Sequence, residues 1–180
     1  MALTSTIYRF QIQLSDVDRN VYESIDVRLA QHPSETARYL ITRALAYALS
    51  YEDGIGFSKG GVSSVDEPPL SIHDLTGKMI AWIDIGLPSA ERLHKGAKHA
   101  RRVELYTSAD LTPLLKEAAS RSIHRADEIA VWMLGADFIE ALEAKLERNT
   151  KLELTRNDGR LYATIQGELI EGTIERRSLT

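Results

Sequence analysis

The chain begins with an alternation of apolar and polar side chains. Residues 8–14 place an apolar side chain at every second position, and residues 25–29 repeat the pattern after a polar segment at 16–20. A period of two is typical of a strand with one buried and one solvated face. We therefore predict an antiparallel β-hairpin within residues 3–30, with one face in water.

The next segment has the period of an amphipathic helix. Pro33 suits a first helical turn, and apolar residues follow at i, i+3, i+4 and i+7 spacing up to residue 49. Residues 52–54, Glu-Asp-Gly, end the helix. Short strands are predicted near 55–58 and at 62–67, and Pro68-Pro69 ends the second of them.

Residues 79–86 form an almost entirely apolar run, which is the pattern of a strand covered on both faces. Pro88 and Ser89 then open a second helix, whose stripe of small apolar residues would let it lie close to a sheet. A helix, three strands, a helix and a strand follow one another in this part of the chain. This αβββαβ order predicts an α/β core at about residues 33–134.

The C-terminal part returns to β structure. Strands are predicted at 103–106 and 128–134, with a weaker helix at 111–120 between them, and a further helix at 138–146. An Asn-Asp-Gly turn at 157–159 separates two more strands, and a last strand follows Gly167. The predicted fold class is α/β with a mixed sheet, in one domain of residues 1–180, with a C-terminal helix and strands at 136–176.

Composition narrows the class of protein. A chain of 180 residues with 43% apolar residues fits one soluble domain, and no run approaches the roughly 20 apolar residues of a membrane span. The first residues show no secretory signal, and the chain has no Cys, so we expect a cytoplasmic protein without a membrane partner. A net charge of −4 argues against a general nucleic-acid coat protein, although a local basic patch can still bind phosphate.

The apolar strand at 79–86 contains one carboxylate, Asp84. An unpaired ionised carboxylate costs several kcal/mol to bury, so Asp84 must be protonated, paired, coordinated to a cation or placed at a solvated strand end. A second acidic pair, Asp66 and Glu67, lies upstream. Because hard cations bind carboxylate oxygens, Asp66, Glu67 and Asp84 are candidate ligands for Mg²⁺. The alternative for Asp66 and Glu67 is an ordinary exposed strand end.

Arg92 and Lys95 lie on the second helix and could face this site. On a helical wheel Arg92 is about 90° from the apolar stripe and can border the sheet, whereas Lys95 projects nearly opposite. Either cation could bind phosphate, pair with Asp84 or belong to a solvated cationic face. These interpretations stay open at the level of the sequence.

Several motifs together carry a family resemblance. They are His32-Pro33-Ser34-Glu35-Thr36, Asp66-Glu67-Pro68 and Trp82-Ile83-Asp84-Ile85-Gly86-Leu87-Pro88, followed by Arg92, Lys95, Val103 and Tyr106. With these motifs the chain resembles the bacterial YaeQ family over essentially its whole length. The resemblance implies a restriction-endonuclease-like fold with a variant of the PD-(D/E)xK site.

The resemblance also implies roles for single residues. The PD-(D/E)xK superfamily places one acid on its first core helix, one on its second strand and one on its third strand. Glu35 would match the helix acid, Asp66 or Glu67 the second-strand acid, and Asp84 the third-strand acid. Gly86 stands where the superfamily has its strand Lys, so Lys95 or Arg92 would replace that cation. For Glu35 there is also a structural alternative, because an acid in the first helical turn, pointing away from the apolar stripe, is favourable against the helix dipole.

Two functions follow as expectations. The first is a Mg²⁺-dependent nuclease or nuclease-like phosphodiesterase, in which metal-bound water would attack the phosphodiester. The second is a non-catalytic nucleic-acid- or protein-binding module that keeps the nuclease-like fold without the strand Lys. A fold by itself does not choose between them.

Overall fold

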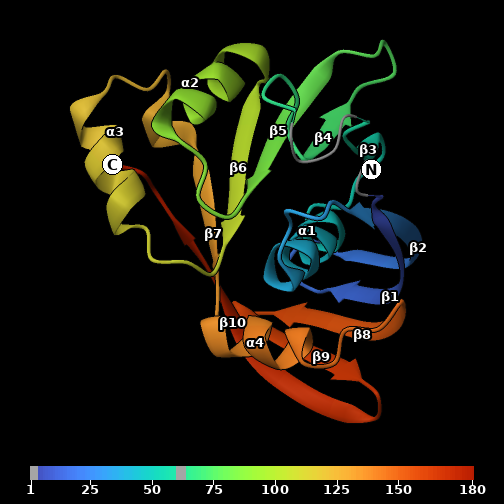
Figure 1. The fold of residues 1–180 in the computed structure, drawn as a ribbon. Helices are drawn as coiled ribbons and strands as arrows, with labels where there is room; N and C mark the ends of the chain where they lie inside the picture. Colours follow the sequence, from blue (N-terminus) through green and yellow to red (C-terminus); the bar gives the residue numbers. More distant parts are fainter. Residues whose placement is uncertain (1–3, 60–63) are drawn as a thin grey trace. The chain divides into compact units, whose positions relative to one another are not determined.

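The computed structural model of the protein describes residues 4–59 and 64–180 (Figure 1). Its helices are α1 (Ala37–Leu49), α2 (Ala90–His99), α3 (Thr112–Ser120) and α4 (Ala136–Glu143), with a 3-10 turn η1 (Ala126–Glu128). Its strands are β1 (Thr6–Asp16), β2 (Val21–Gln31), β3 (Ile55–Phe57), β4 (Leu70–His73), β5 (Met79–Ile85), β6 (Arg102–Thr107), β7 (Ala130–Leu134), β8 (Asn149–Asn157), β9 (Arg160–Ile165) and β10 (Glu168–Arg177). The predicted class, α/β with a mixed sheet, is confirmed.

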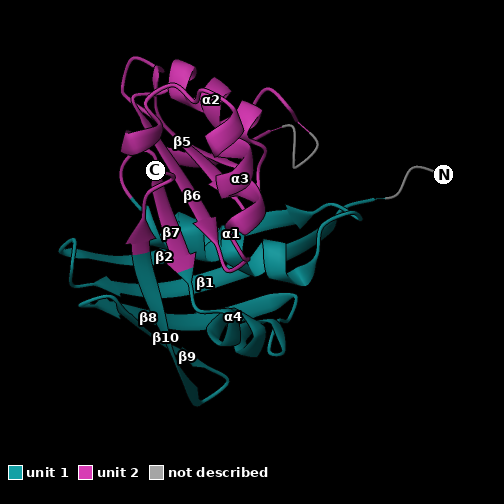
Figure 2. Ribbon diagram, turned by 90° about the vertical axis from the view of Figure 1, so that its left-hand side faces the viewer, with its two compact units in different colours: residues 1–51, 134–175 teal, residues 52–133, 176–180 magenta. Residues whose placement is uncertain are grey.

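The chain divides into two compact units (Figure 2). Unit 1 comprises residues 1–51 and 134–175, and unit 2 comprises residues 52–133 and 176–180. The single-domain interpretation of residues 1–180 stays a prediction. No helix in the described part of the chain is long and apolar enough to span a membrane.

Unit 1 contains a mixed sheet with the strand order β2-β1-β8-β9-β10. β1 and β2 form the predicted antiparallel hairpin, in an unbroken register from Thr6 opposite Gln31 to Asp16 opposite Val21. β8 runs parallel to β1, and β9 and β10 continue the sheet in antiparallel fashion. The hairpins predicted at both ends of the chain therefore meet in one sheet, through a pairing that links residues about 140 positions apart.

Helices α1 and α4 bury their apolar faces in unit 1. α1 packs on β1, β2 and α4, and its Leu40, Leu45 and Leu49 are almost completely buried. The helix begins at Ala37 because Thr36 is its N-cap and accepts a hydrogen bond from the Tyr39 N–H. The predicted helix is confirmed, but it starts after Pro33 rather than at it.

The strands of unit 2 are hydrogen-bonded in the order β7-β6-β5-β4-β3. β5, β6 and β7 are parallel, whereas β3 and β4 are added in antiparallel fashion. An apolar cluster joins α2 and α3 to β5, β6 and β7, and it includes Trp82, Leu93, Leu105 and Leu114. The predicted αβββαβ order from α1 to β6 is confirmed.

The strand predicted at 62–67 is wrong in its position. Residues 62 and 63 lie outside the described residues, and residues 64–67 have irregular structure. The strand of this region is β4, which begins at Leu70, directly after Pro68-Pro69. A proline can precede a strand without removing a hydrogen bond from its interior, so the prolines mark the start of a strand here and not its end. Asp66 and Glu67 consequently lie on a loop.

Candidate functional site

Strand β5 carries Asp84 into the interior of unit 2, as the apolar run predicts. β5 is covered on both edges by β4 and β6, and Asp84 lies opposite Leu105 of β6. Only 1% of the Asp84 surface is exposed. Trp82 precedes it by two residues and so projects from the same face of the strand.

Both oxygens of the Asp84 carboxylate accept a hydrogen bond. Trp82 Nε1 donates to Oδ2 at 2.7 Å, and Arg92 Nε donates to Oδ1 at 2.7 Å. Burial raises the pKa of Asp84, and the opposing effects of the Arg92 charge and the two hydrogen bonds do not outweigh it. The structure therefore selects the ion pair from the alternatives that the sequence leaves open for this carboxylate.

Arg92 connects β5 to the loop that precedes β4. Its Nη1 donates to the Ser64 carbonyl at 3.2 Å and its Nη2 to the Glu67 carbonyl at 2.9 Å. The guanidinium carbon also lies 5.6 Å from the centre of the Trp82 ring, within the range of a cation–π contact. The helical wheel is correct on this point, since Arg92 and not Lys95 reaches the strand acid.

Lys95 pairs with a different acid. Its ammonium binds the Asp66 carboxylate and lies 3.4 Å from the Val65 carbonyl oxygen. The hydrogen bond from Lys95 lowers the pKa of Asp66, but most of that side chain is exposed, so the pair adds little stability. Glu67 contributes its backbone carbonyl to Arg92. Asp66, Glu67, Asp84, Arg92 and Lys95 are thus gathered on neighbouring elements of unit 2.

Gly86, where the resemblance expects a Lys, has a backbone conformation that favours Gly. Gly86 has a φ of +80°, in the left-handed region that side chains other than Gly rarely adopt. Its N–H bonds to the Tyr106 carbonyl at 2.9 Å, and β5 ends one residue earlier, at Ile85. The chain has therefore left the extended conformation at the position where the resemblance expects a Lys.

A second glycine lets α2 approach the sheet. A Cβ atom at Gly96 would lie 2.9 Å from Cγ of the Trp82 ring, closer than van der Waals contact allows. The indole therefore lies directly beneath this helix. The stripe of small residues predicted for α2 consequently sets the distance between the helix and the sheet, at which Arg92 lies within hydrogen-bonding distance of Asp84.

Glu35 belongs to unit 1, and the prediction that it lies in the first turn of the helix is wrong. It lies before the N-cap Thr36 and not in the first helical turn, because α1 begins only at Ala37. Its side chain is 2% exposed, and its Oε1 is 3.3 Å from Arg43 Nη1. Burial raises the pKa of Glu35, against the attraction of Arg43. Arg43 also donates to the Ala30 carbonyl at 2.7 Å, so the pair joins α1 to β2.

The acids of unit 2 do not form an open metal site in this arrangement. Within residues 4–59 and 64–180 no three His, Asp or Glu side chains are placed to hold one metal ion. At Asp84, a guanidinium takes the place that a divalent cation would need, so the donors as arranged do not fit Mg²⁺. Mg²⁺ binding stays a prediction.

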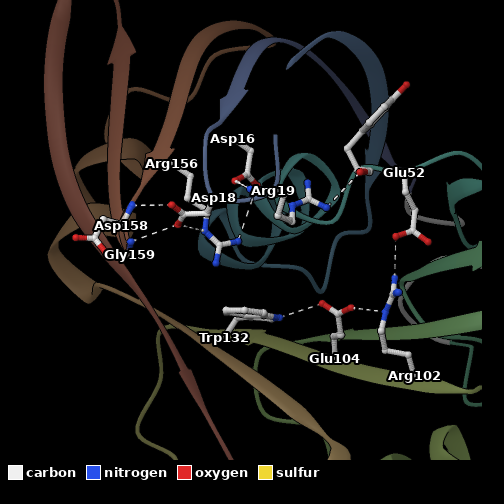
Figure 3. A network of polar contacts seen from close by, with 11 residues as sticks. Asp16, Asp18, Arg19, Glu52, Arg102, Glu104, Trp132, Arg156, Asp158 and Gly159 are labelled. Carbon is white, nitrogen blue, oxygen red and sulfur yellow. Dashed lines mark hydrogen bonds and ion pairs between the residues drawn. The ribbon is translucent and has the colours of Figure 1, made fainter. Parts of the chain in front are cut away.

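Unit 2 contains a further polar network that sequence reasoning missed (Figure 3). Arg102 binds Glu52 at 3.1 Å and Glu104 at 2.7 Å, and Trp132 Nε1 donates to Glu104 at 3.0 Å. Glu104 is 8% exposed. An acid within the predicted apolar strand 103–106 is the same kind of signal as Asp84 and could have identified it.

A corresponding network in unit 1 fixes the turn between β8 and β9 (Figure 3). Asp18 accepts hydrogen bonds from the N–H groups of Asp158, at 2.7 Å, and Gly159, at 3.4 Å. These bonds lower the pKa of Asp18. Asp16, fully buried, binds Arg19 at 2.7 Å and lies 3.8 Å from Arg156. Arg19 is a local partner, three residues from Asp16, but no local sequence signal marks Arg156, Asp158 and Gly159 as partners, since the pairing of β1 with β8 brings them together with Asp16 and Asp18.

Cations are concentrated on and after α2. Residues 90–102 carry five Lys or Arg and a single acid, in a protein of net charge −4. Arg92, Lys95 and Arg102 are paired with acids. Lys98 and Arg101 are exposed, and neither has an ion-pair partner among the residues that the structure describes. They are the cations of this segment that remain available to a ligand.

The sequence model of the family described as "YaeQ protein" matches residues 1–174. The chain belongs to the YaeQ family. The YaeQ relatives include the proteins named "Uncharacterized protein YaeQ" from Escherichia coli strain K12, 29% identical, and from Salmonella typhi, 30% identical. Each match covers 90% of this chain and 90% of the relative.

Crystal structures of YaeQ proteins share the fold. The YaeQ protein from Pseudomonas syringae is 30% identical, with a TM-score of 0.86 over 96% of this chain and 95% of its own. The YaeQ protein from Xanthomonas axonopodis pv. citri is 32% identical, with a TM-score of 0.86 over 97% of this chain and 98% of its own. The α/β arrangement described above is therefore that of experimentally determined YaeQ structures.

Proposed function

We propose that this YaeQ-family protein is a non-catalytic nucleic-acid-binding module that retains a nuclease-like core. The observation that carries the proposal is the closed contact between Asp84 and Arg92. The acid that a nuclease would use to hold metal is here compensated by a cation of the protein itself. Catalysis by a metal at Asp84 would require this contact to open first.

Opening the contact would be costly. Arg92 makes hydrogen bonds to the Asp84 carboxylate and to the carbonyls of Ser64 and Glu67. A hydrogen bond that involves a charged group contributes about 1.5 to 3 kcal/mol, so a metal would have to replace several kcal/mol of existing interactions. Mg²⁺ also dehydrates reluctantly and prefers several open oxygen positions, which a buried carboxylate with two donors does not offer.

The phosphate-binding part of the proposal rests on Lys98 and Arg101. Exposed cations without acid partners lose no internal ion pair when they meet a phosphate. Arg92 and Lys95, by contrast, are retained by Asp84 and Asp66. We therefore assign the phosphate contacts to the exposed end of α2 and the residues that follow it, and a structural role to Arg92.

The test is binding of fluorescently labelled single-stranded DNA, double-stranded DNA and RNA, followed by anisotropy in EDTA across a range of salt. We expect binding without metal, and a charge-reversed variant, Lys98→Glu with Arg101→Glu, should bind at least about tenfold more weakly. Loss of two phosphate contacts should also reduce the slope of log affinity against log salt by about two.

A matched control removes the same charge elsewhere in unit 2. Lys78→Glu with Arg176→Glu changes two exposed cations outside α2 and should leave most of the affinity intact. Absence of binding by the wild type to all three nucleic acids at low salt would refute the proposal. An equal loss in both double variants would show a nonspecific charge effect and would contradict the assigned surface.

A second candidate, a divalent-metal-dependent nuclease, is favoured by one observation. Asp84, Asp66, the Glu67 carbonyl and two cations of α2 gather in unit 2, as the resemblance implies for metal-binding acids and a cation that replaces the strand Lys. Cleavage of any of these nucleic acids with Mg²⁺ or Mn²⁺, abolished by Asp84→Asn, would establish this candidate. Metal-independent binding with no cleavage would support the non-catalytic module.

A further inference from the structure

Strand β2 lies at one end of the unit 1 sheet, so that one of its two edges has no strand partner among the described residues. β2 runs for 11 residues and pairs with β1 along its whole length without a register shift. It contains no Pro, and β1 is its only strand partner among the described residues. It packs against β1 and α1, and near its end the Ala30 carbonyl accepts a hydrogen bond from Arg43 of α1 at 2.7 Å. Proteins commonly shorten such an edge or interrupt it with a bulge or a Pro, because it is a template for another strand.

The hydrogen-bonding direction of the open edge follows from β1. The Arg9 N–H donates to the Arg148 carbonyl, and the Ile7 carbonyl accepts from the Arg148 side chain, so both groups point away from β2. In an antiparallel pair the residue opposite such a position also directs its backbone groups outward. Arg28 lies opposite Arg9, and Asp26 is two residues away. Both therefore present their N–H and C=O at the open edge.

We propose that a second copy of this chain pairs with β2 in antiparallel fashion, with the twofold axis at Val27. Asp26 of one copy then lies opposite Arg28 of the other, and each such pair exchanges two backbone hydrogen bonds. Ile25 and Leu29 lie opposite each other on the face directed to the core. The partly exposed Val27 meets its own copy and is covered.

Charge complementarity selects this register and this occupant. A twofold axis at Asp26 or at Arg28 would place like charges directly opposite each other, which is destabilising. An axis at Ile25 would pair Asp26 with Ser24 and leave Arg28 without an acid. Only the axis at Val27 brings both opposite charges together, and it does so twice. An edge whose charges are complementary to a second copy of itself fits a homodimer.

The existing contact of Asp26 is compatible with the pairing. Arg9 binds both oxygens of the Asp26 carboxylate: Nε donates to Oδ1 at 2.8 Å and Nη2 to Oδ2 at 2.5 Å, and both side chains are partly exposed on the outer face of the sheet. A carboxylate has about four acceptor positions, so it can bind Arg9 of its own chain and Arg28 of the other copy. The result is a row of alternating charges across the interface.

The experiment is sedimentation of the full chain from about 1 to about 100 µM, a range that detects weak and moderate self-association. We expect twice the mass of 20.1 kDa at high concentration. Arg28→Asp places acids opposite acids, and Asp26→Arg places bases opposite bases. Each variant alone should dimerise at least about tenfold more weakly, because two like-charged pairs replace two attractive ones.

Mixing the two variants gives the decisive result. In a mixed dimer every acid faces a base, so an equimolar mixture should dimerise within about threefold of the wild type. Lys151→Glu, an exposed charge change on β8, should dimerise like the wild type. Circular dichroism checks that each variant is folded. A wild type that stays monomeric, single variants that dimerise normally, or a mixture that stays monomeric would each overturn the proposal.

Discussion

Removal of Asp84 tests whether its contact with Arg92 is structural. In Asp84→Ala, the N–H donors of Trp82 Nε1 and Arg92 Nε lose their acceptor in a site where the Arg92 side chain is 21% exposed. Breaking a buried ion pair by removing one partner costs about 3 to 5 kcal/mol. Because Arg92 is partly exposed and can recover some hydration, we expect a loss of about 3 kcal/mol in the free energy of unfolding.

A change of the partner, Arg92, and a double variant separate the energy of the Asp84–Arg92 interaction from the other effects of each substitution. Arg92→Met keeps an apolar side chain over the Trp82 ring but leaves the carboxylate with a single donor. Its cost should be about 2 to 3 kcal/mol, because Asp84 can take up a proton to reduce the penalty. Asp84→Ala with Arg92→Met should cost about 1 to 3 kcal/mol less than the sum of the two single changes.

Tryptophan fluorescence during urea unfolding is a suitable measurement. The chain has two Trp residues, Trp82 and Trp132, and both lie in unit 2, so the signal reports the unit that contains the pair. A loss below about 1 kcal/mol in Asp84→Ala, or strict additivity in the double variant, would refute the structural role. Asp84 would then be a poorly compensated acid of the kind that functional sites retain.

Two further predictions concern Gly96 of α2 and Glu35, which precedes the N-cap of α1. Gly96→Ala should lower the free energy of unfolding by about 1 to 3 kcal/mol, because the new methyl group would overlap the Trp82 ring. Gly56→Ala is the matched control and should change this free energy far less, because no atom lies within 4 Å of the new Cβ. Equal effects of the two changes in urea unfolding would contradict the packing argument. Glu35→Gln should alter the pH dependence of stability: burial raises the folded-state pKa of Glu35, so this group contributes stability at pH values below its unfolded pKa that is lost as the pH rises through its folded pKa. The wild type should therefore lose stability relative to Glu35→Gln as the pH rises above 4.5, the ordinary pKa of Glu, and parallel curves for the two proteins would show that the pKa of Glu35 is not raised.

Local sequence patterns determined most of the secondary structure. The alternation in β1 and β2, the helical period of α1 and the apolar run of β5 each act over fewer than fifteen residues, the range over which side-chain periodicity reports a buried face. The stripe of α2 also predicted correctly that Arg92 borders the sheet. Burial of Asp84 followed from the same reasoning, because its neighbours in the strand are apolar.

Predictions failed where a boundary depended on a single residue type. Pro33 and Pro68-Pro69 are compatible with a helix start or a strand end, but Thr36 caps α1 and β4 begins at Leu70. These shifts of a few residues moved Glu35 out of the helical phase and placed Asp66 on a loop. Side-chain direction is sensitive to such shifts, because one residue rotates a helical position by about 100°.

The partners of the charged residues were decided only by the tertiary structure. The sequence shows that Asp84 needs compensation, but several cations were available, and the close approach of Gly96 to Trp82 brings Arg92 into reach. Likewise, the parallel pairing of β1 with β8 joins the two ends of the chain in unit 1. Local periodicity carries no information about such pairings, because they depend on which distant surfaces bury each other most completely.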